Sequence, residues 1–364
     1  MSKERVAILY GGRSGEHEVS LSSAASVYRN LDGRRYEAIL IGIAKDGRWY
    51  LQPPEIGEAA SKPEAPLSLA TRPESLITVL PAAGLALDGA PLKVDVVFPV
   101  LHGSFGEDGT VQGLLEVAGL PYVGAGVLGS SLAMDKQRVK EVWQERQLPV
   151  LPFVGLSRKD VQENAAEQLL KEQLAEWGFP LFVKPARTGS SVGITKVNEA
   201  AGLRSALETA LLWDSRLIVE PGVDAREIET AVLGGEEPTV FEPGEVVVRR
   251  EFYSYEAKYL DPEGAELSIP AELSKSLRDR IREIALRAFL SADCHGLARI
   301  DLFLERNSGE IFLNEINTIP GFTRISMFPK MVEAGGVPYP ELITRLIELG
   351  KSRKTERDGL RYEF

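Results

Sequence analysis

The amino-acid sequence predicts an α/β protein whose N-terminal domain is built on an open, largely parallel sheet. Three short apolar segments carry this prediction, because residues 5–10, 36–43 and 94–101 each have the length and composition of a buried strand. The first segment runs into Gly11 and then into a helical pattern that continues to Leu31. Strands that alternate with helices are typical of parallel sheets, which bind ligands at the carboxyl ends of their strands.

The rest of the chain continues this alternation. We expect helices at 135–147, 159–177, 271–291 and 340–350, strands at 178–185, 216–221 and 227–234, and a hairpin at 296–317. The last helix should pack on the outside of the molecule. Residues 52–92 are rich in Pro, Ala, Gly and Glu with weak periodicity, so we interpret them as a surface excursion without chemistry. The turn-rich segment 121–130 predicts a domain boundary near residue 130.

Size and composition restrict the class of protein. A chain of 364 residues suggests two or three domains. The formal net charge of -11 repels phosphate backbones and anionic lipids, which excludes nucleic acid and membrane partners. Cys294 is the only cysteine, so no intramolecular disulfide can form, and we expect it to be a small buried hydrophobe. The sequence shows neither a signal peptide nor a long apolar segment, and we expect a cytoplasmic protein.

The predicted hairpin carries the strongest candidate site. Arg299 and Asp301 are two apart on its first strand, and Glu315 and Asn317 are two apart on its second, so each pair projects from one face. A turn at 307–309 would place Asp301 opposite Glu315 and Arg299 opposite Asn317, and a slip of one residue would separate them.

Two carboxylates and an amide oxygen on one face are ligands that suit Mg²⁺ at the phosphates of a nucleotide. The alternative is the polar outer face of a half-exposed hairpin. The apolar content of both strands argues against it, because burial of unpaired carboxylates would be costly.

A second candidate is a loop that can enclose phosphates. Lys184 ends a strand and is followed by the glycine- and serine-rich segment 188–193, in which Ser190 and Ser191 lie. Backbone N–H groups and hydroxyls can close on phosphate, while the lysine supplies a positive charge. The alternative is a flexible connector, since loops rich in glycine and serine are common.

Two further segments follow predicted strands of the first sheet. His102 begins the segment HGSFGEDGTVQG directly after the strand at 94–101, which is a position typical of a ligand site. A single histidine is more often structural than catalytic. Glu16 lies in GGRSGEHEVS at the start of the first helix, where it either favours the helix N-terminus or holds the ammonium of an amino-acid substrate.

These segments together resemble the D-alanine–D-alanine ligase family over nearly the whole chain, from Val6 to about Gly350. The matching stretches are GGRSGEHEVSL, HGSFGEDGTVQG, MDKQRVK, FVKPARTGSSVG, FYSYEAKYL, ARIDLFL and NEINTIPGFTRISMFP. The resemblance implies a three-domain ATP-grasp architecture. Its parts are an N-terminal substrate-binding α/β domain at residues 1–130, a central ATP-grasp subdomain at 131–215, and a C-terminal subdomain at 216–364 with the metal and oxyanion site.

The resemblance also implies roles for individual residues. The expected phosphate contacts are Lys136, Lys184, Ser190 and Ser191, and the expected nucleoside contacts are Glu220 at the adenine amino group, Val223, and Glu227 at the ribose. The implied ligands of Mg²⁺ or Mn²⁺, bound as a pair of ions, are Asp301, Glu315 and Asn317. The first D-alanine is assigned to Glu16, with His102 near the reacting groups, and the second to Lys258, Ser326 and Met327. Arg299 and the backbone N–H of Gly321 would stabilise a tetrahedral oxygen.

The implied reaction has two steps and serves the synthesis of peptidoglycan precursors. The carboxylate of the first D-alanine takes the γ-phosphoryl group of ATP, and the amine of the second attacks the acyl phosphate. Tyr259 lies in the segment FYSYEAKYL, which resembles the mobile loop of the family, and the tyrosine form goes with D-alanine as second substrate. We expect a homodimer. Whether His102 orients a group or moves a proton stays open at this point.

Two other classes of protein compete with this interpretation. A nicotinamide-dependent oxidoreductase would need a glycine fingerprint and an acid after the second strand, where Lys45 lies instead. A non-catalytic nucleotide-binding regulator need not keep the acids at 301 and 315. The nearest alternative is another ATP-grasp carboxylate–amine ligase with a different second substrate.

Overall fold

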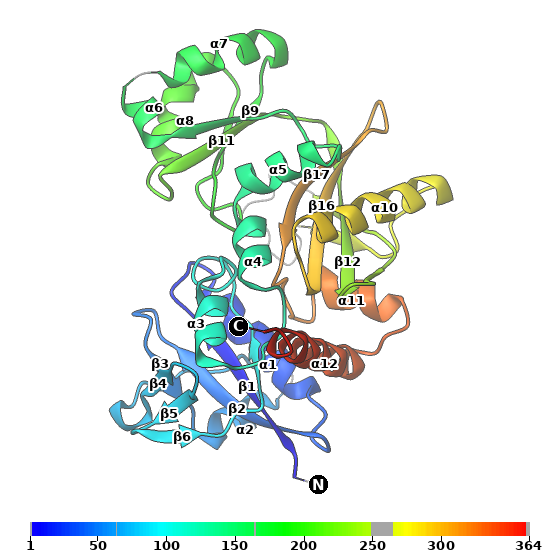
Figure 1. The fold of residues 1–364 in the computed structure, drawn as a ribbon. Helices are drawn as coiled ribbons and strands as arrows, with labels where there is room; N and C mark the ends of the chain where they lie inside the picture. Colours follow the sequence, from blue (N-terminus) through cyan, green and yellow to red (C-terminus); the bar gives the residue numbers. More distant parts are fainter. Residues whose placement is uncertain (1, 63, 164, 249–264, 362–364) are drawn as a thin grey trace.

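The computed structural model describes residues 2–62, 64–163, 165–248 and 265–361. Figure 1 shows the N-terminal part of the chain at the bottom of the view, a smaller sheet with α6, α7 and α8 at the top, and a larger sheet with α10 between them. In the described part of the chain, every helix is too short or too polar to cross a membrane.

The N-terminal sheet has the predicted parallel core. β1 (Glu4–Gly11) lies between β2 (Tyr36–Ile43) and β7 (Val96–Pro99) and is parallel to both, while β3 (Trp49–Leu51) is antiparallel to β2 at the edge. The apolar run of β1 is buried from Val6 to Tyr10. α1 (His17–Asn30) follows β1 and packs against it. The carboxyl ends of β1 and β7 therefore open onto the segments that contain Glu16 and His102.

Residues 52–92 form regular structure, although their sequence shows weak periodicity. α2 (Pro54–Ala60) and the short turn η1 (Pro73–Ser75) precede an antiparallel sheet of β4 (Ile77–Leu80), β5 (Gly84–Leu87) and β6 (Ala90–Leu92). Strands of three or four residues are too short to show a clear alternation, which explains why no strand was predicted here. None of the predicted site residues lies in this segment.

Three helices lead out of the N-terminal region. They are α3 (Thr110–Ala118), α4 (Val127–Met134) and α5 (Lys136–Glu145). Asp135 ends α4 and caps α5, because its carboxylate accepts a hydrogen bond from the backbone N–H of Arg138 at 3.1 Å. The expected boundary near residue 130 thus falls inside a helix, and the division into three domains stays a prediction.

The second sheet is antiparallel and has the strand order β10-β9-β11-β8. Its strands are β8 (Val154–Ser157), β9 (Leu181–Pro185), β10 (Thr195–Val197) and β11 (Arg216–Pro221). The helix expected at 159–177 is two helices, α6 (Arg158–Gln162) and α7 (Ala166–Trp177). α6 stops because Glu163 leaves the helical region, with φ -87° and ψ 7°. η2 (Ala200–Gly202) and α8 (Leu203–Ala210) cover the sheet, with α8 against β9 and β10.

The third sheet has the order β15-β14-β12-β16-β17, and β13 pairs with β12. The strands are β12 (Ala225–Gly234), β13 (Thr239–Val240), β14 (Gly244–Val248), β15 (Ala265–Ser268), β16 (Gly296–Glu305) and β17 (Ile311–Asn317). One face carries Ile300, Leu302 and Leu304, which pack in one cluster with α10 (Lys275–Ser291). Cys294 is buried in the same cluster, as expected. The opposite face of β16 is therefore left for polar side chains.

The C-terminal helices join the first and third sheets. α11 (Met327–Ala334) is followed by α12 (Tyr339–Asp358), which is longer than the predicted helix at 340–350. α12 contacts α1, β7 and β16, and its apolar face is fully buried. Its opposite side carries the exposed residues Glu341 and Arg345, which agrees with a helix that packs on the outside through its apolar face. One hydrophobic cluster includes residues of β1, β12 and α12, so the first and third sheets share a core.

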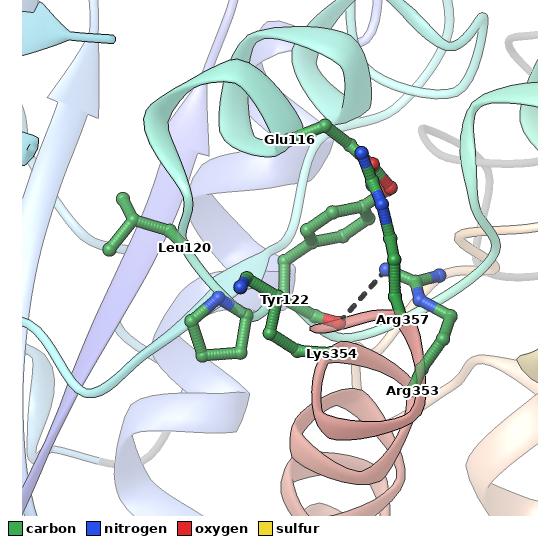
Figure 2. Close-up of a pocket in the computed structure, with 7 residues that line it drawn as sticks. Glu116, Leu120, Tyr122, Arg353, Lys354 and Arg357 are labelled. Carbon is green, nitrogen blue, oxygen red and sulfur yellow. Dashed lines mark hydrogen bonds and ion pairs between the residues drawn. The ribbon is translucent and has the colours of Figure 1, made fainter. Parts of the chain in front are cut away.

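The far end of α12 is attached to the segment after α3, as Figure 2 shows. The guanidinium of Arg353 lies 4.1 Å from the ring centroid of Tyr122 and donates to the backbone carbonyl of Tyr122 at 3.4 Å. Glu116, Leu120 and Lys354 also line the small pocket at this junction. No residue of the predicted site lines this pocket, so we interpret the junction as structural.

Candidate active site

The hairpin places its two acids side by side. Asp301 pairs with Glu315, and Arg299 pairs with Asn317, as the sequence predicts. The route to this register differs from the prediction, because nearer the turn Leu304 pairs with Ile311 instead of Phe312. A β-bulge at Asn314 lies between the two parts of the ladder and restores the register. The ladder near the turn is thus shifted by one residue from the predicted register, and the bulge removes this shift before the ladder reaches the two acids.

Arg299 and Asp301 form the centre of a polar network on this face. The guanidinium of Arg299 donates from Nε and Nη2 to the two carboxylate oxygens of Asp301 at 2.7 and 2.6 Å. Nε of Arg299 also lies 3.0 Å from the carboxylate of Glu229 on β12. Glu229 is the residue opposite Asp301 in the β12–β16 pair. Burial lowers the pKa of Arg299, but the charges of Asp301 and Glu229 outweigh it, and the net pKa is raised. Arg299 is therefore a permanent, fixed cation here.

The same face offers oxygen ligands for a divalent cation. The side-chain amide of Asn317 donates to Asp301 at 3.0 Å, so the polar ends of both residues meet. Turning the amide would present its oxygen instead, because the two ends of the group are nearly equal in shape. The described residues hold no cluster of three or more His, Cys, Asp or Glu side chains that could bind a metal. A metal at this position would thus need the amide oxygen besides the two carboxylates, a donor set that fits Mg²⁺ or Mn²⁺.

Lys136 connects this face to the glycine- and serine-rich loop. Its ammonium donates to the backbone carbonyl of Thr188 at 2.5 Å and lies 3.7 Å from the carboxylate of Glu315. Lys136 is buried at the start of α5. One lysine thus lies beside both the predicted metal ligand and the predicted phosphate loop.

A buried carboxylate holds the second predicted phosphate lysine. Lys184 on β9 lies 2.6 Å from one oxygen of Glu220 on β11, and Lys140 on α5 contacts the other oxygen. Glu220 is 1% exposed. Burial raises its pKa, but the positive charges of Lys140 and Lys184 outweigh this effect and lower the pKa to about 2. Glu220 is therefore a carboxylate at neutral pH.

The loop at 188–193 reaches the N-terminal region. The hydroxyl of Ser190 donates to the carboxylate of Glu16. Ser190 and Ser191 both have positive φ, 48° and 59°. Non-glycine residues rarely adopt this conformation, and those that do are often found at functional sites. Gly189 allows the close approach, because a Cβ there would lie 2.9 Å from an oxygen of Glu16. The loop between β9 and β10 thus lies against Glu16 of the N-terminal region.

His102 and Glu107 lie between Glu16 and the segment after β17. Nδ1 of His102 is 3.0 Å from the carbonyl of Ile319, and Nε2 is 3.0 Å from the hydroxyl of Ser23. Glu107 accepts from the backbone N–H of Gly103 at 2.7 Å and from that of Ile319 at 3.2 Å. Burial lowers the pKa of His102. Burial and the charge of Glu16 raise the pKa of Glu107 to about 8.

The residues expected around the second substrate follow β17. The hydroxyl of Ser326 accepts from the backbone N–H of Thr323 at 3.1 Å, and Met327 is buried at the start of α11. Gly321 packs on Ser326, because a Cβ at Gly321 would lie 2.7 Å from the serine oxygen. Lys258 and Tyr259 lie outside the described residues.

The expected nucleoside contacts lie around the end of β11. Val223 follows β11 and is partly buried, and Glu227 lies on β12. Glu227 and Glu229 are two apart on one strand and therefore lie on the same face of the third sheet, the face of Asp301. Among the predicted site residues, the structure brings Lys184 to Glu220, Ser190 to Glu16 and Arg299 to Asp301.

Four residues of this network were not predicted from the sequence. They are Ser23, Glu107, Lys140 and Glu229. Lys140 lies four residues after Lys136 and thus on the same side of α5, a spacing that could have indicated it. Glu107 lies inside the segment that was singled out for His102. Ser23 and Glu229 give no local signal, because their partners are distant in sequence.

Comparisons with known proteins identify the relatives of this chain. Family models described as the D-ala D-ala ligase N-terminus and C-terminus match residues 5–125 and 142–348. The D-alanine–D-alanine ligase of Treponema denticola is 46% identical over 359 residues, which cover 97% of each chain. The D-alanine–D-alanine ligase A of Bradyrhizobium diazoefficiens is 47% identical over 372 residues, which cover 98% of each chain.

Solved structures extend the comparison to three dimensions. The D-alanine–D-alanine ligase from Coxiella burnetii is similar with a TM-score of 0.81 and 36% identity, over 98% of this chain and 97% of that one. The VanG D-Ala:D-Ser ligase from Enterococcus faecalis is similar with a TM-score of 0.83 and 36% identity, over 96% of this chain and 100% of that one. D-alanine–D-alanine ligases have the ATP-grasp fold, so the predicted fold class is confirmed.

The matched models and the relatives thus cover nearly the whole chain, including every segment on which the resemblance in the sequence depended. The chain therefore belongs to the D-alanine–D-alanine ligase family.

Proposed function

We propose that this protein joins two D-alanine molecules with ATP through an acyl phosphate, and so supplies the dipeptide for peptidoglycan precursors in the cytoplasm. The observation that carries the proposal is the pairing of Asp301 with Glu315 beside the ammonium of Lys136. Two fixed carboxylates and a buried cation on one face are the elements that a phosphoryl-transfer site needs. Membership of the family supports the choice of D-alanine and ATP.

The phosphates of ATP are assigned to Lys136, Lys184, Ser190 and Ser191. Lys184 holds Glu220 in the present structure, so it would have to turn from this carboxylate towards a phosphate when the nucleotide binds. Lys140 keeps the other oxygen of Glu220 and prevents a buried, unpaired carboxylate during that change. Glu220, Val223 and Glu227 would then contact the nucleoside.

Asp301, Glu315 and Asn317 would hold a pair of Mg²⁺ or Mn²⁺ ions. The bound ions would neutralise charge on the phosphates. To bind an ion, the carboxylate of Asp301 would have to contact both the cation and Arg299. This is possible because a carboxylate has about four acceptor positions. Arg299 would thereby stay fixed by Glu229 and Asp301 while the cation binds.

The amino-acid substrates are assigned to the space between the loop and the N-terminal region. Glu16 would hold the ammonium of the first D-alanine, and Arg299 and the N–H of Gly321 would stabilise the oxygen on which charge collects. Ser326, Met327 and Lys258 would surround the second D-alanine. Tyr259 would close the mobile loop, and Ser190 supports this arrangement because it already contacts Glu16.

The protein is also proposed to be a homodimer. Four large apolar side chains on the adjacent helices α3 and α4 are exposed: Leu114, Val117, Val127 and Leu128. Val117 is 61% and Leu128 62% exposed, and such a patch is typical of a protein interface. The paired changes Val117→Asp and Leu128→Asp should convert a dimer into a monomer in light scattering. A monomeric wild-type protein would contradict the proposal.

A panel of substrates tests the proposed activity. Phosphate release from ATP is measured with D-alanine, L-alanine, D-serine or D-lactate as the added acceptor, in the presence of D-alanine. We expect D-alanine to be preferred and the dipeptide to form in equal amount with phosphate. The similarity to a D-Ala:D-Ser ligase makes D-serine the informative comparison. A preference for D-serine or D-lactate would contradict the proposed second substrate.

A further inference from the structure

The backbone after β17 is held from both sides by buried side chains of the N-terminal region. The N–H of Ile319 donates to Glu107 at 3.2 Å, and its carbonyl lies 3.0 Å from Nδ1 of His102. Three residues further on, the N–H of Phe322 donates to the hydroxyl of Ser23 at 3.2 Å. Ser23, His102 and Glu107 are all buried. The segment between these anchors contains Gly321.

The chemistry of these groups fixes the direction of each hydrogen bond. A carbonyl can only accept, so Nδ1 of His102 must carry the proton that it shares with Ile319. In a neutral imidazole, Nε2 is then an acceptor, and the hydroxyl of Ser23 donates to it. The oxygen of Ser23 is left to accept from Phe322. A single chain of bonds therefore runs from Phe322 through Ser23 and His102 to Ile319.

Glu107 completes this arrangement on the other side of the Ile319 residue. One of its side-chain oxygens accepts from Ile319, and the other accepts from Gly103, next to His102 in the chain. The turn at Gly103 has φ of 72°, and a Cβ there would lie 2.6 Å from an oxygen of Glu16. The residues that fix the Gly321 segment thus also border the proposed site of the first substrate.

We propose that Ser23, His102 and Glu107 are positioning residues, which hold residues 319–322 so that the N–H of Gly321 meets the oxygen that becomes negatively charged. This inference rests on the proposed function, in which that N–H stabilises the tetrahedral oxygen. Because both ring nitrogens of His102 are engaged by Ile319 and Ser23, the imidazole orients the backbone and carries no proton between substrates. An N–H that is fixed in advance stabilises developing charge without reorganisation during the reaction.

The state of the imidazole can be measured without any turnover. In protein labelled with ¹⁵N-histidine, the ring nitrogens of the three histidines should be separable, and a His102→Asn variant assigns the signals of His102. We expect a neutral ring with the proton on Nδ1 between pH 7 and pH 9, because burial lowers the pKa of His102. A proton on Nε2, or an imidazolium in this range, would overturn the proposal.

Kinetics of two variants test the effect on the reaction. Ser23→Ala removes the link between His102 and Phe322, and Glu107→Gln keeps one acceptor oxygen in an isosteric side chain. The matched control is Ser22→Ala, the partly buried neighbour on α1 whose hydroxyl donates to the carbonyl of Glu18 in the same helix. We expect kcat to fall about tenfold or more in both variants, while the affinity for a non-hydrolysable ATP analogue stays within about twofold of the wild type.

The outcomes separate this inference from the proposed function. A wild-type enzyme that makes the dipeptide, with variants of unchanged kcat, would overturn the positioning role alone. Parallel losses of kcat, analogue affinity and thermal stability in Ser23→Ala would also overturn it, since they would indicate a merely structural contact. A wild-type protein that forms no dipeptide from D-alanine would instead refute the proposed function.

Discussion

Asp301 lies directly opposite Glu315 across the β16–β17 pair, while its neighbour Leu302 lies opposite Leu313. The extra residue, Asn314, changes the register by one position between these two pairs. Side chains of a strand alternate between faces, so an unbroken ladder from Leu302 would set Asn314 opposite Asp301 and send Glu315 towards α10. The bulge is therefore the local feature that brings both acids to one face.

An exchange of the residues at 314 and 315 should abolish activity, whereas a change of the bulge side chain alone should not. The paired changes Asn314→Glu and Glu315→Asn keep the number of residues but place the carboxylate on the bulge, outside the pair with Asp301, whereas Asn314→Ala leaves Glu315 opposite Asp301. We expect loss of dipeptide synthesis in the exchange and activity within a few-fold of wild type in Asn314→Ala. Circular dichroism checks that both variants are folded. Equal activity of the two variants would show that the position of the acid does not matter.

Glu315→Ala should remove ligase activity while the fold stays intact. The change deletes one of the two carboxylates that we assign to the divalent cation, and a fall in kcat of at least about 100-fold is expected. Glu310→Ala is the matched control, because Glu310 is exposed at the turn of the same hairpin. Near-normal turnover of Glu315→Ala at saturating Mg²⁺ would remove this residue from the site.

Lys184→Ala should weaken the binding of ATP. The ammonium is assigned to a phosphate, and loss of a hydrogen bond with a charged group lowers affinity by roughly 10–100-fold. Lys140 stays beside Glu220, so we expect the protein to remain folded. Lys196→Ala on the exposed side of β10 serves as control. The assignment is wrong if nucleotide affinity and turnover are both unchanged in titrations with the ATP analogue.

Glu220→Gln should destabilise the protein in a manner that depends on pH. The folded-state pKa of Glu220 is about 2, against 4.5 for the ordinary carboxyl, because Lys140 and Lys184 outweigh the effect of burial. The ionised carboxylate of Glu220 therefore adds about 3 kcal/mol to the free energy of unfolding above pH 4.5. This contribution is lost as the pH falls towards 2.

Urea unfolding at pH 7 and at pH 3 measures this contribution. At pH 7 the variant leaves two buried ammonium groups without their carboxylate, and a loss of about 3–5 kcal/mol is expected. At pH 3 the difference between wild type and variant should be smaller. Glu199→Gln, at an exposed position, should show no such dependence. A difference that is constant between the two pH values would refute the charged state of Glu220.

Some elements could be predicted from the sequence because their signals are local. β2 and β11 have the predicted bounds, since each is an apolar run with polar or turn residues at its ends. The pairing of Asp301 with Glu315 followed from the alternation of side chains and an assumed turn. That assumed turn was one residue off, and only the bulge at Asn314 made the final pairing agree.

The remaining features depend on contacts between distant parts of the chain. Lys140 and Glu220 are 80 residues apart, and Ser23 and Phe322 are 299 apart, so no local pattern indicates either pair. The sheet of β4, β5 and β6 has strands too short for periodicity. The packing of α12 against both α1 and β16 likewise needs the folded chain. Local patterns thus indicated the candidate site residues, whereas most of the contacts that support them depend on the folded chain.

The most direct test of the central claim follows an oxygen atom. The enzyme is supplied with ATP, Mg²⁺ and D-alanine whose carboxylate carries ¹⁸O, and the released phosphate is analysed by mass spectrometry. If the carboxylate takes the γ-phosphoryl group and the amine then expels phosphate, one ¹⁸O passes into phosphate for each dipeptide formed. Dipeptide that forms while the phosphate stays unlabelled, or ATP cleavage without any D-alanyl-D-alanine, would contradict the account.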